Sequence, residues 1–322
     1  MKNKDKIVIA ILDQGVFPWW NDVNSELAEN YAKYFSGFEM EYKDFADNGN
    51  DWENYPAGSH GFWVLDRLLQ VCGSQKKIKI INCKVFSNLR YNSDALHNAL
   101  EYVTSEGVDL VNLSIGIPRY ARLSSEAWLE KYNELLNGIV DQNGFTIISG
   151  GNEGERLSNG AVIDNSNIMA DDPYNNISVG SHDKDGYWDS FSSAGGTIDV
   201  STIGSNLNLL GEREIESVSG TSFSAPTFSG ICANYLIDQF TNLRSGEKSS
   251  KDIIYGHLHE AIPPTFGAFR RFLNRGERSA WYGQGSFESY AKFFIEYYER
   301  DVLQHSLFNT GNEETEVLLK TM

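Results

Sequence analysis

The chain alternates apolar runs of strand length with stretches of helical period. The runs rich in Ile and Val predict strands buried on both faces: Ile7 to Leu12, Ile78 to Val85, Val108 to Leu113 and Phe145 to Ser149. The spacing of apolar residues predicts helices over Ser59 to Cys72, Ser93 to Glu106, Ser125 to Gln142 and Ser222 to Phe240. This alternation is typical of an α/β fold in which helices flank a mainly parallel sheet.

The polar stretch Thr241 to Ser250 could be a domain linker, but we interpret it as a surface loop, because the segments after it resemble parts of the same domain. With 322 residues, 41% of them hydrophobic, the chain can bury a sizeable core. We therefore expect a folded globule.

The chain is strongly acidic, with 44 Asp and Glu against 27 Lys and Arg and a formal net charge of −17. That charge repels phosphate backbones and anionic lipid surfaces, so nucleic acid and membranes are poor partners. No apolar run approaches the ~20 residues of a membrane span. Peptides and proteins remain as partners, and the composition leaves the oligomeric state open.

The three cysteines, Cys72, Cys83 and Cys232, show no metal-ligand spacing and predict buried free thiols. The basic start and the apolar run after it superficially resemble a signal peptide. However, Asp13 interrupts that run after six residues, short of the roughly 7–15 that an export signal needs. The expectation is a cytoplasmic protein.

Four motifs that contain glycine also contain polar residues that could act in catalysis. Asp13 ends the first apolar run in ILDQGV, and His60 lies in GSHG where a helix is expected to begin. Asn152 lies in the turn of SGGNEG, and Ser222 in GTSFSAP, where a turn leads into a helix. Each has an ordinary structural interpretation by itself, and Asn152 could be a simple turn former. Their combination, in the chain order Asp, His, Asn, Ser, has a low chance of arising at random.

These motifs resemble those of the subtilases, the subtilisin-like serine proteases. VDLVNLSIG is similar to the family's substrate-binding strand, YNNISVGS and SFSSAGG to its later core strands, and WYGQGSFESYAKFF to its terminal segment. The resemblance implies a subtilisin-like three-layer fold, with one peptidase domain over residues 1–296. Residues 297–322 would form a C-terminal extension whose end is expected to be disordered.

Family resemblance also implies roles for single residues. Ser222 would be the nucleophile, His60 the general base and then acid, and Asp13 the residue that orients the imidazole. The Asn152 amide and the Ser222 backbone N–H would bind the oxyanion. Two segments would bind substrate: Ser114, Ile115 and Gly116 by pairing with its backbone, and Ser149, Gly150 and Gly151 by lining the first specificity pocket.

The chain also departs from the family pattern. Gly61-Phe62-Trp63 replaces the usual Gly-Thr-His, which places different packing behind His60. The segment after His60 is short and lacks the Asn-rich loop that holds calcium in many secreted relatives, so no metal is expected there, and a different calcium site built by acidic residues elsewhere stays open. The resemblance implies no organic cofactor. Residues 14–59 form an insertion rich in aromatics, which could fill the core or form a lid.

The sequence therefore predicts a serine endopeptidase acting through an acyl-enzyme. The acidic surface, the insertion and the absence of an export signal favour a dedicated processing role, such as removing the leader of a ribosomally made peptide. General protein turnover and a non-catalytic, peptide-binding scaffold are the alternatives. Whether the acidic residues Glu153, Asp164, Asp171 and Asp172 favour a basic side chain before the cut, or the pocket is apolar, stays open.

Overall fold

A computed structural model represents the protein. It describes residues 5–16, 29, 32–33, 35–46, 59–72, 75–87, 90–91, 93–117, 126–154, 167, 169, 176–184, 189–193, 198–210, 215–246, 248–250 and 252–253. The expected terminal segment WYGQGSFESYAKFF and the extension 297–322 lie outside these residues. Within them, no helix is long and apolar enough to cross a membrane.

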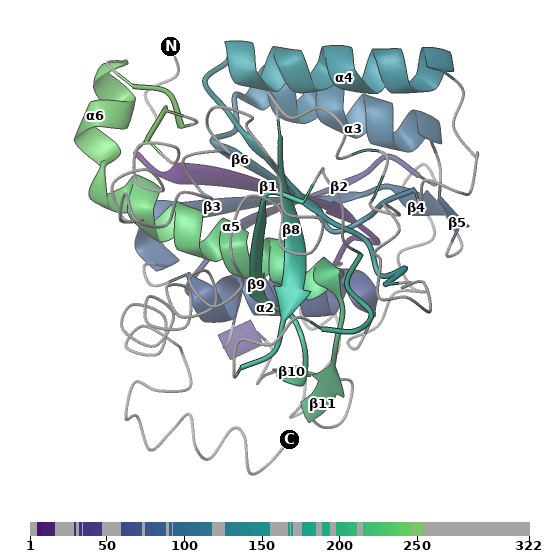
Figure 1. Cartoon of the computed structure of the whole chain (residues 1–322). Helices are drawn as coiled ribbons and strands as arrows, with labels where there is room; N and C mark the ends of the chain where they lie inside the picture. The colour runs from purple at the N-terminus through teal and green to yellow at the C-terminus, as the bar shows by residue number, and fades with distance from the viewer. Residues whose placement is uncertain are drawn as a thin grey trace, which may run out of the picture.

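A seven-stranded sheet forms the middle of the molecule (Figure 1). In spatial order its strands are β2 (Glu39–Asp44), β3 (Ile78–Lys84), β1 (Ile7–Asp13), β6 (Leu110–Leu113), β7 (Thr146–Ser149), β8 (Asn176–His182) and β9 (Val200–Ile203). Every neighbouring pair is parallel. The mainly parallel sheet expected from the apolar runs is thus confirmed.

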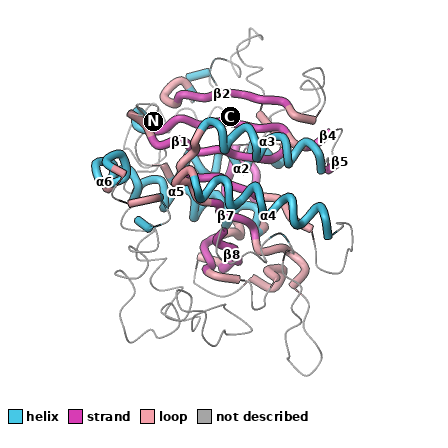
Figure 2. The backbone as a smooth tube through the Cα atoms, turned by 90° about the horizontal axis from the view of Figure 1, so that it is seen from above, coloured by secondary structure: helices cyan, strands magenta, loops and turns pink. Residues whose placement is uncertain are grey.

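Helices cover both faces of this sheet. α3 (Ser93–Glu106) and α4 (Glu126–Asp141) lie on one face, and α2 (His60–Val71) and α5 (Thr221–Asp238) lie on the other (Figures 1 and 2). Successive side chains of a strand point to opposite faces. Ile9 and Ile11 of β1 accordingly belong to the core under α2 and α5, whereas Ala10 and Leu12 belong to the core under α3 and α4.

Smaller elements connect these layers. A short 3₁₀ helix, η3 (Gln75–Lys77), precedes β3, and β4 (Phe86–Ser87) pairs with β5 (Arg90–Tyr91) in a two-stranded sheet after it. β10 (Leu207–Leu210) and β11 (Ile215–Val218) form an antiparallel pair. β11 leads directly into α5, so this pair flanks the segment that contains Ser222.

The four predicted strands and four predicted helices are present, with bounds shifted by two residues at most. Two expectations are wrong. Thr241–Ser250 is not simply a loop, because α6 (Phe240–Ser245) extends into it and Leu243 packs in the core. The described part of SFSSAGG, residues 190–193, is a turn, since Ser192 N bonds to Asp189 O and Ser193 N to Gly151 O rather than to a strand.

The described part of the insertion 14–59 contributes to the core and the sheet. Phe35 and Phe38 are buried, and the Phe35 ring meets Phe62 of α2 edge to face at 5.8 Å between centroids. β2 adds an edge strand, which the sequence analysis missed. Tyr42 lies in β2 and Phe45 directly after it, whereas the remaining aromatics of the insertion lie outside the described residues: Phe17, Trp19, Trp20, Tyr31, Tyr34, Trp52 and Tyr55. For Phe35 and Phe38, core packing is the role that the structure supports.

Candidate active site

The polar residues singled out in the sequence converge at one edge of the sheet. Asp13 is the last residue of β1, Ser114 follows β6, and Ser149 ends β7. The carboxyl ends of parallel strands meet at the same edge, which is where α/β proteins build their sites. Helices α2 and α5 begin near this edge with His60 and Ser222 in their first turns.

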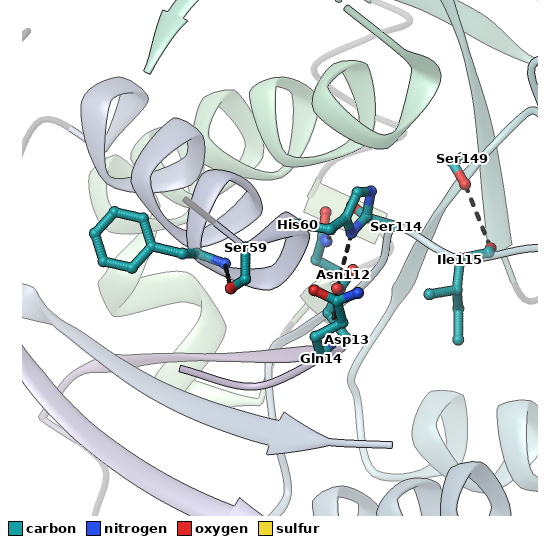
Figure 3. Close-up of polar contacts among 9 residues, drawn as sticks. Asp13, Gln14, Ser59, His60, Asn112, Ser114, Ile115 and Ser149 are labelled. Atoms are coloured by element: carbon teal, nitrogen blue, oxygen red, sulfur yellow. Dashed lines mark hydrogen bonds and ion pairs between the residues drawn. The ribbon is translucent and has the colours of Figure 1, made fainter. Parts of the chain in front are cut away.

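Asp13 and His60 form a direct hydrogen bond. Nδ1 of His60 lies 2.8 Å from Oδ1 of Asp13, and the two side chains point toward each other in Figure 3. The Asp13 side chain is fully buried, and its Oδ1 also accepts from Gln14 N at 2.7 Å. The carboxylate is therefore held in place, while the imidazole, 32% exposed, can still meet a substrate.

The pKa of His60 reflects two opposing effects. Burial lowers the pKa by disfavouring the charged imidazolium. The negative charge of Asp13 and the hydrogen bond to it raise the pKa, and together they outweigh the effect of burial. The net result is a pKa above the ordinary 6.5 for histidine. Asp13 thus stabilises the protonated form that a general base must pass through.

Ser222 lies in the first turn of α5 and is partly exposed. The ring of its neighbour Phe223 contacts the His60 ring at 5.7 Å between centroids, which brings this turn against the imidazole. N–H groups in the first turn of a helix have no acceptor within the helix and lie at the positive end of its dipole. Ser222 therefore combines a side-chain hydroxyl with a backbone environment suited to negative charge.

Asn152 is anchored to the same turn by Thr221. Its Oδ1 accepts from both the backbone N and the hydroxyl of Thr221, each at 2.9 Å. These two bonds fix the orientation of the amide, and Nδ2 lies toward Gly220, where an added Cβ would sit 3.6 Å away. Gly151 before it has φ +107°, a conformation that other residues rarely adopt. The amide nitrogen thus lies near Gly220, the residue from which α5 begins.

The two expected substrate-binding segments lie beside each other beyond β6 and β7. The Ser149 hydroxyl donates to Ile115 O at 3.3 Å, as Figure 3 shows. Gly116 is exposed, and an added Cβ there would collide with Asn167. The Asn167 amide links the segments by donating to Ile115 O at 3.1 Å and to Ser149 O at 3.0 Å.

Comparison with known proteins identifies the family. The family model described as "Subtilase family" matches residues 4–254. The chain belongs to the subtilase family. It is a serine endopeptidase by that membership, and it is 24% identical to thermitase of Thermoactinomyces vulgaris over 255 residues, which are 77% of this chain and 82% of thermitase.

Solved structures share the fold of this subtilase. A lanthipeptide protease is 16% identical, with a TM-score of 0.63, and the match covers 90% of this chain and 87% of that one. The epidermin leader peptide processing serine protease of Staphylococcus aureus is 16% identical, with a TM-score of 0.60 and coverages of 91% and 76%. At such identities these likenesses show the common fold.

Several contact residues of the subtilase site were missed in the sequence. Asn112, fully buried in β6, donates to the Ser114 hydroxyl at 2.9 Å and accepts from Ser229 of α5 at 3.0 Å. A polar Asn inside the apolar run VDLVNLS was the sequence feature that could have indicated Asn112. No sequence feature indicated Thr221 or Asn167, because their contacts are with segments that are distant in the sequence.

The acidic residues near the expected pocket are only partly described. The Glu153 carboxylate accepts from the Ser193 hydroxyl at 2.9 Å, which ties it to a neighbouring turn. Asp164, Asp171 and Asp172 lie outside the described residues. Within the described part of the subtilase, no group of three or more His, Cys, Asp or Glu side chains could hold a metal ion.

Proposed function

We propose that Ser222 attacks the scissile carbonyl and that His60 accepts the Ser222 proton through Nε2. Its Nδ1–H would stay on Asp13, which orients the ring and stabilises the imidazolium. The 2.8 Å contact between Asp13 and His60, at the edge where Ser222 and Asn152 also lie, is the observation that carries this proposal.

The remaining steps use the same groups. Asn152 Nδ2 and the Ser222 N–H donate to the oxyanion of the tetrahedral intermediate. His60 then returns its proton to the leaving amine, which departs and leaves an acyl-enzyme. Water deprotonated by His60 attacks the ester, and Ser222 regains its proton when the acid product leaves.

The substrate would bind as an extended strand. Ser114, Ile115 and Gly116 would pair with its backbone, and the exposed backbone of Gly116 supports such an approach. The segment Ser149 to Gly151 would line the pocket for the side chain before the scissile bond. Bound in this way, the substrate would have its scissile carbonyl next to Asn152.

We favour dedicated peptide processing in the cytoplasm as the physiological role. Two structures of this fold are a lanthipeptide protease and an epidermin leader peptide processing protease, which supports processing over turnover. The net charge of −17 favours basic peptides. The three cysteines are free and buried, in keeping with a reducing compartment.

Two measurements test this function. A fluorophosphonate probe should label the wild-type chain, and Ser222→Ala should not be labelled. A synthetic peptide library and a denatured proteome should then be cut at few sequences if the role is processing. If the probe labels the wild-type chain but cleavage occurs at many sequences, general protein turnover is the better description of its role. If the probe does not label the wild-type chain, the protein is a non-catalytic scaffold.

A further inference from the structure

The helix that begins at His60 packs along the helix that carries Ser222. One stripe of α2, formed by His60, Trp63 and Arg67 at positions i, i+3 and i+7, faces α5. His60 and Trp63 contact the Phe223 ring, at 5.7 and 6.4 Å between centroids, and Arg67 contacts Thr227. The interface between α2 and α5 therefore sets the position of His60, the proposed base, relative to Ser222, the proposed nucleophile.

This interface leaves little room farther along the helices. An added Cβ at Gly230 of α5 would lie 2.6 Å from Cβ of Val71 and 3.2 Å from Leu68 O of α2. The two backbones therefore approach closely at this end. This close approach fixes the distance between the helices only at that end. Contacts nearer the site must therefore prevent α2 from rotating or sliding against α5 at the His60 end.

Arg67 makes the directional contact in the middle of the interface. Its side chain is buried, and Nε donates to the Thr227 hydroxyl at 2.8 Å. Thr227 is fully buried, and its hydroxyl donates to Phe223 O at 2.7 Å. A chain of two hydrogen bonds therefore leads from α2 to the carbonyl of Phe223, the residue that directly follows Ser222.

Neighbouring polar groups extend this contact to the strand pair before α5. Arg67 Nη1 donates to Gln70 Oε1 at 3.4 Å, and Gln70 Nε2 donates to Asp66 Oδ2 and to Asn208 O, each at 3.2 Å. Oδ2 of Asp66, which is fully buried, also accepts from Leu210 N at 2.8 Å. The same network thus holds β10, whose partner β11 leads into Ser222.

Stability is a weak reason for this arrangement. Burying a guanidinium and a carboxylate removes both from water, and well-packed apolar residues of similar volume are often as stabilising. Hydrogen bonds, in contrast, fix distance and direction. We propose that Arg67 is a positioning residue, which through Thr227 holds α2 against α5 and aligns His60 with Ser222.

The matched variants are Thr227→Val, which replaces the hydroxyl with a methyl, and Arg67→Met, which keeps the length of the side chain. A misplacement of about 1 Å at a catalytic group can cost up to ~10²-fold. Each variant should lower kcat and the rate of fluorophosphonate labelling by about 10-fold to 10²-fold, with KM within about twofold. The double variant should lose about as much as either single one, because both break the same contact.

Thr104→Val is the control. Thr104 is also a helical threonine whose hydroxyl bonds back to a carbonyl, Leu100 O at 2.7 Å, but it lies in α3 on the other face of the sheet. It should leave kcat and labelling unchanged, even if it lowers the melting temperature as much as Thr227→Val does. Arg67→Lys, which can still donate to Thr227, should restore part of the labelling rate lost in Arg67→Met.

This inference rests on the proposed roles of His60 and Ser222, and the labelling assay separates the two failures. Wild-type chain that resists the probe would refute the roles themselves. Wild-type labelling with unchanged kcat in folded Thr227→Val would refute only the positioning role. Equal losses of kcat in Thr227→Val and Thr104→Val, in step with their melting temperatures, would also refute it.

Discussion

The two helices that meet at the site begin in different ways. α2 begins after Ser59, whose hydroxyl accepts from Phe62 N at 3.4 Å and so caps the helix with its own side chain. α5 begins after Gly220, which has no side chain to cap it. Its first N–H, that of Thr221, bonds instead to Asn152. The α2 end is capped by the residue directly before it, whereas the N–H at the α5 end is bonded by the amide oxygen of Asn152, which lies in the turn after β7.

This difference matches the different tasks proposed for the two ends. In the proposed mechanism His60 would act through its ring, which Asp13 holds from the side, so N–H donors at the start of α2 can be used for capping. Ser222 would lie next to the developing negative charge, which N–H groups that are not already bonded would stabilise. A capping side chain at Gly220 would compete with the oxyanion for those donors.

The largest effect should come from the α5 end itself. Ser222→Ala removes the proposed nucleophile from a partly exposed position and should abolish turnover while leaving the fold intact. Peptide hydrolysis and circular dichroism, measured on the same sample, check both statements. Turnover at the wild-type level in this variant would rule out the mechanism.

The next largest effect should come from the residue that holds the α2 end. Asp13→Asn should lower kcat by about 10⁴-fold, the usual magnitude for this change in a serine protease triad. The pKa of His60 should also fall, because burial lowers it and the charge that raises it is gone.

The pH profile of this variant gives a separate readout. In the proposed mechanism neutral imidazole is the active form, so activity should fall as pH drops through the pKa of His60. The wild-type acid limb of kcat/KM should therefore lie above pH 6.5, and that of Asp13→Asn should lie lower. An acid limb that stays in place would show that Asp13 does not control His60.

Asn152→Ala tests the amide that completes the α5 end. Loss of one oxyanion donor should lower kcat by about 10²–10³-fold, with little change in KM. Thr221→Val is the matched control, because it removes one of the two bonds to Oδ1 and keeps the backbone N–H. Its kcat should fall less than that of Asn152→Ala. A drop below threefold for Asn152→Ala would mean that Asn152 is only a turn residue.

The sequence predicted the parts of the molecule that local patterns determine. Buried strands and amphipathic helices follow from apolar spacing, and the site motifs lie at their ends. β2 was missed because EMEYKD is charged and half-exposed at the edge of the sheet. α6 was missed because its sequence is mostly polar, and the few residues that pack in the core, such as Leu243, form no clear helical pattern. Arg67 and the Thr221–Asn152 contact could not be predicted, since their partners are set by packing between distant segments.

The smallest effect should come from the cap of α2. Ser59→Ala removes the acceptor for Phe62 N and should lower the free energy of unfolding by about 0.5–1 kcal/mol, the low end for a cap because the bond is long. The imidazole is held by Asp13 and not by the cap, so kcat should stay within about twofold. Ser105→Ala in α3, an exposed serine that bonds Tyr102 O, is the control for a surface hydroxyl and should change stability less. If Ser59→Ala instead lowered kcat more than tenfold at unchanged stability, the cap would be orienting His60, and both helix starts would serve the reaction directly.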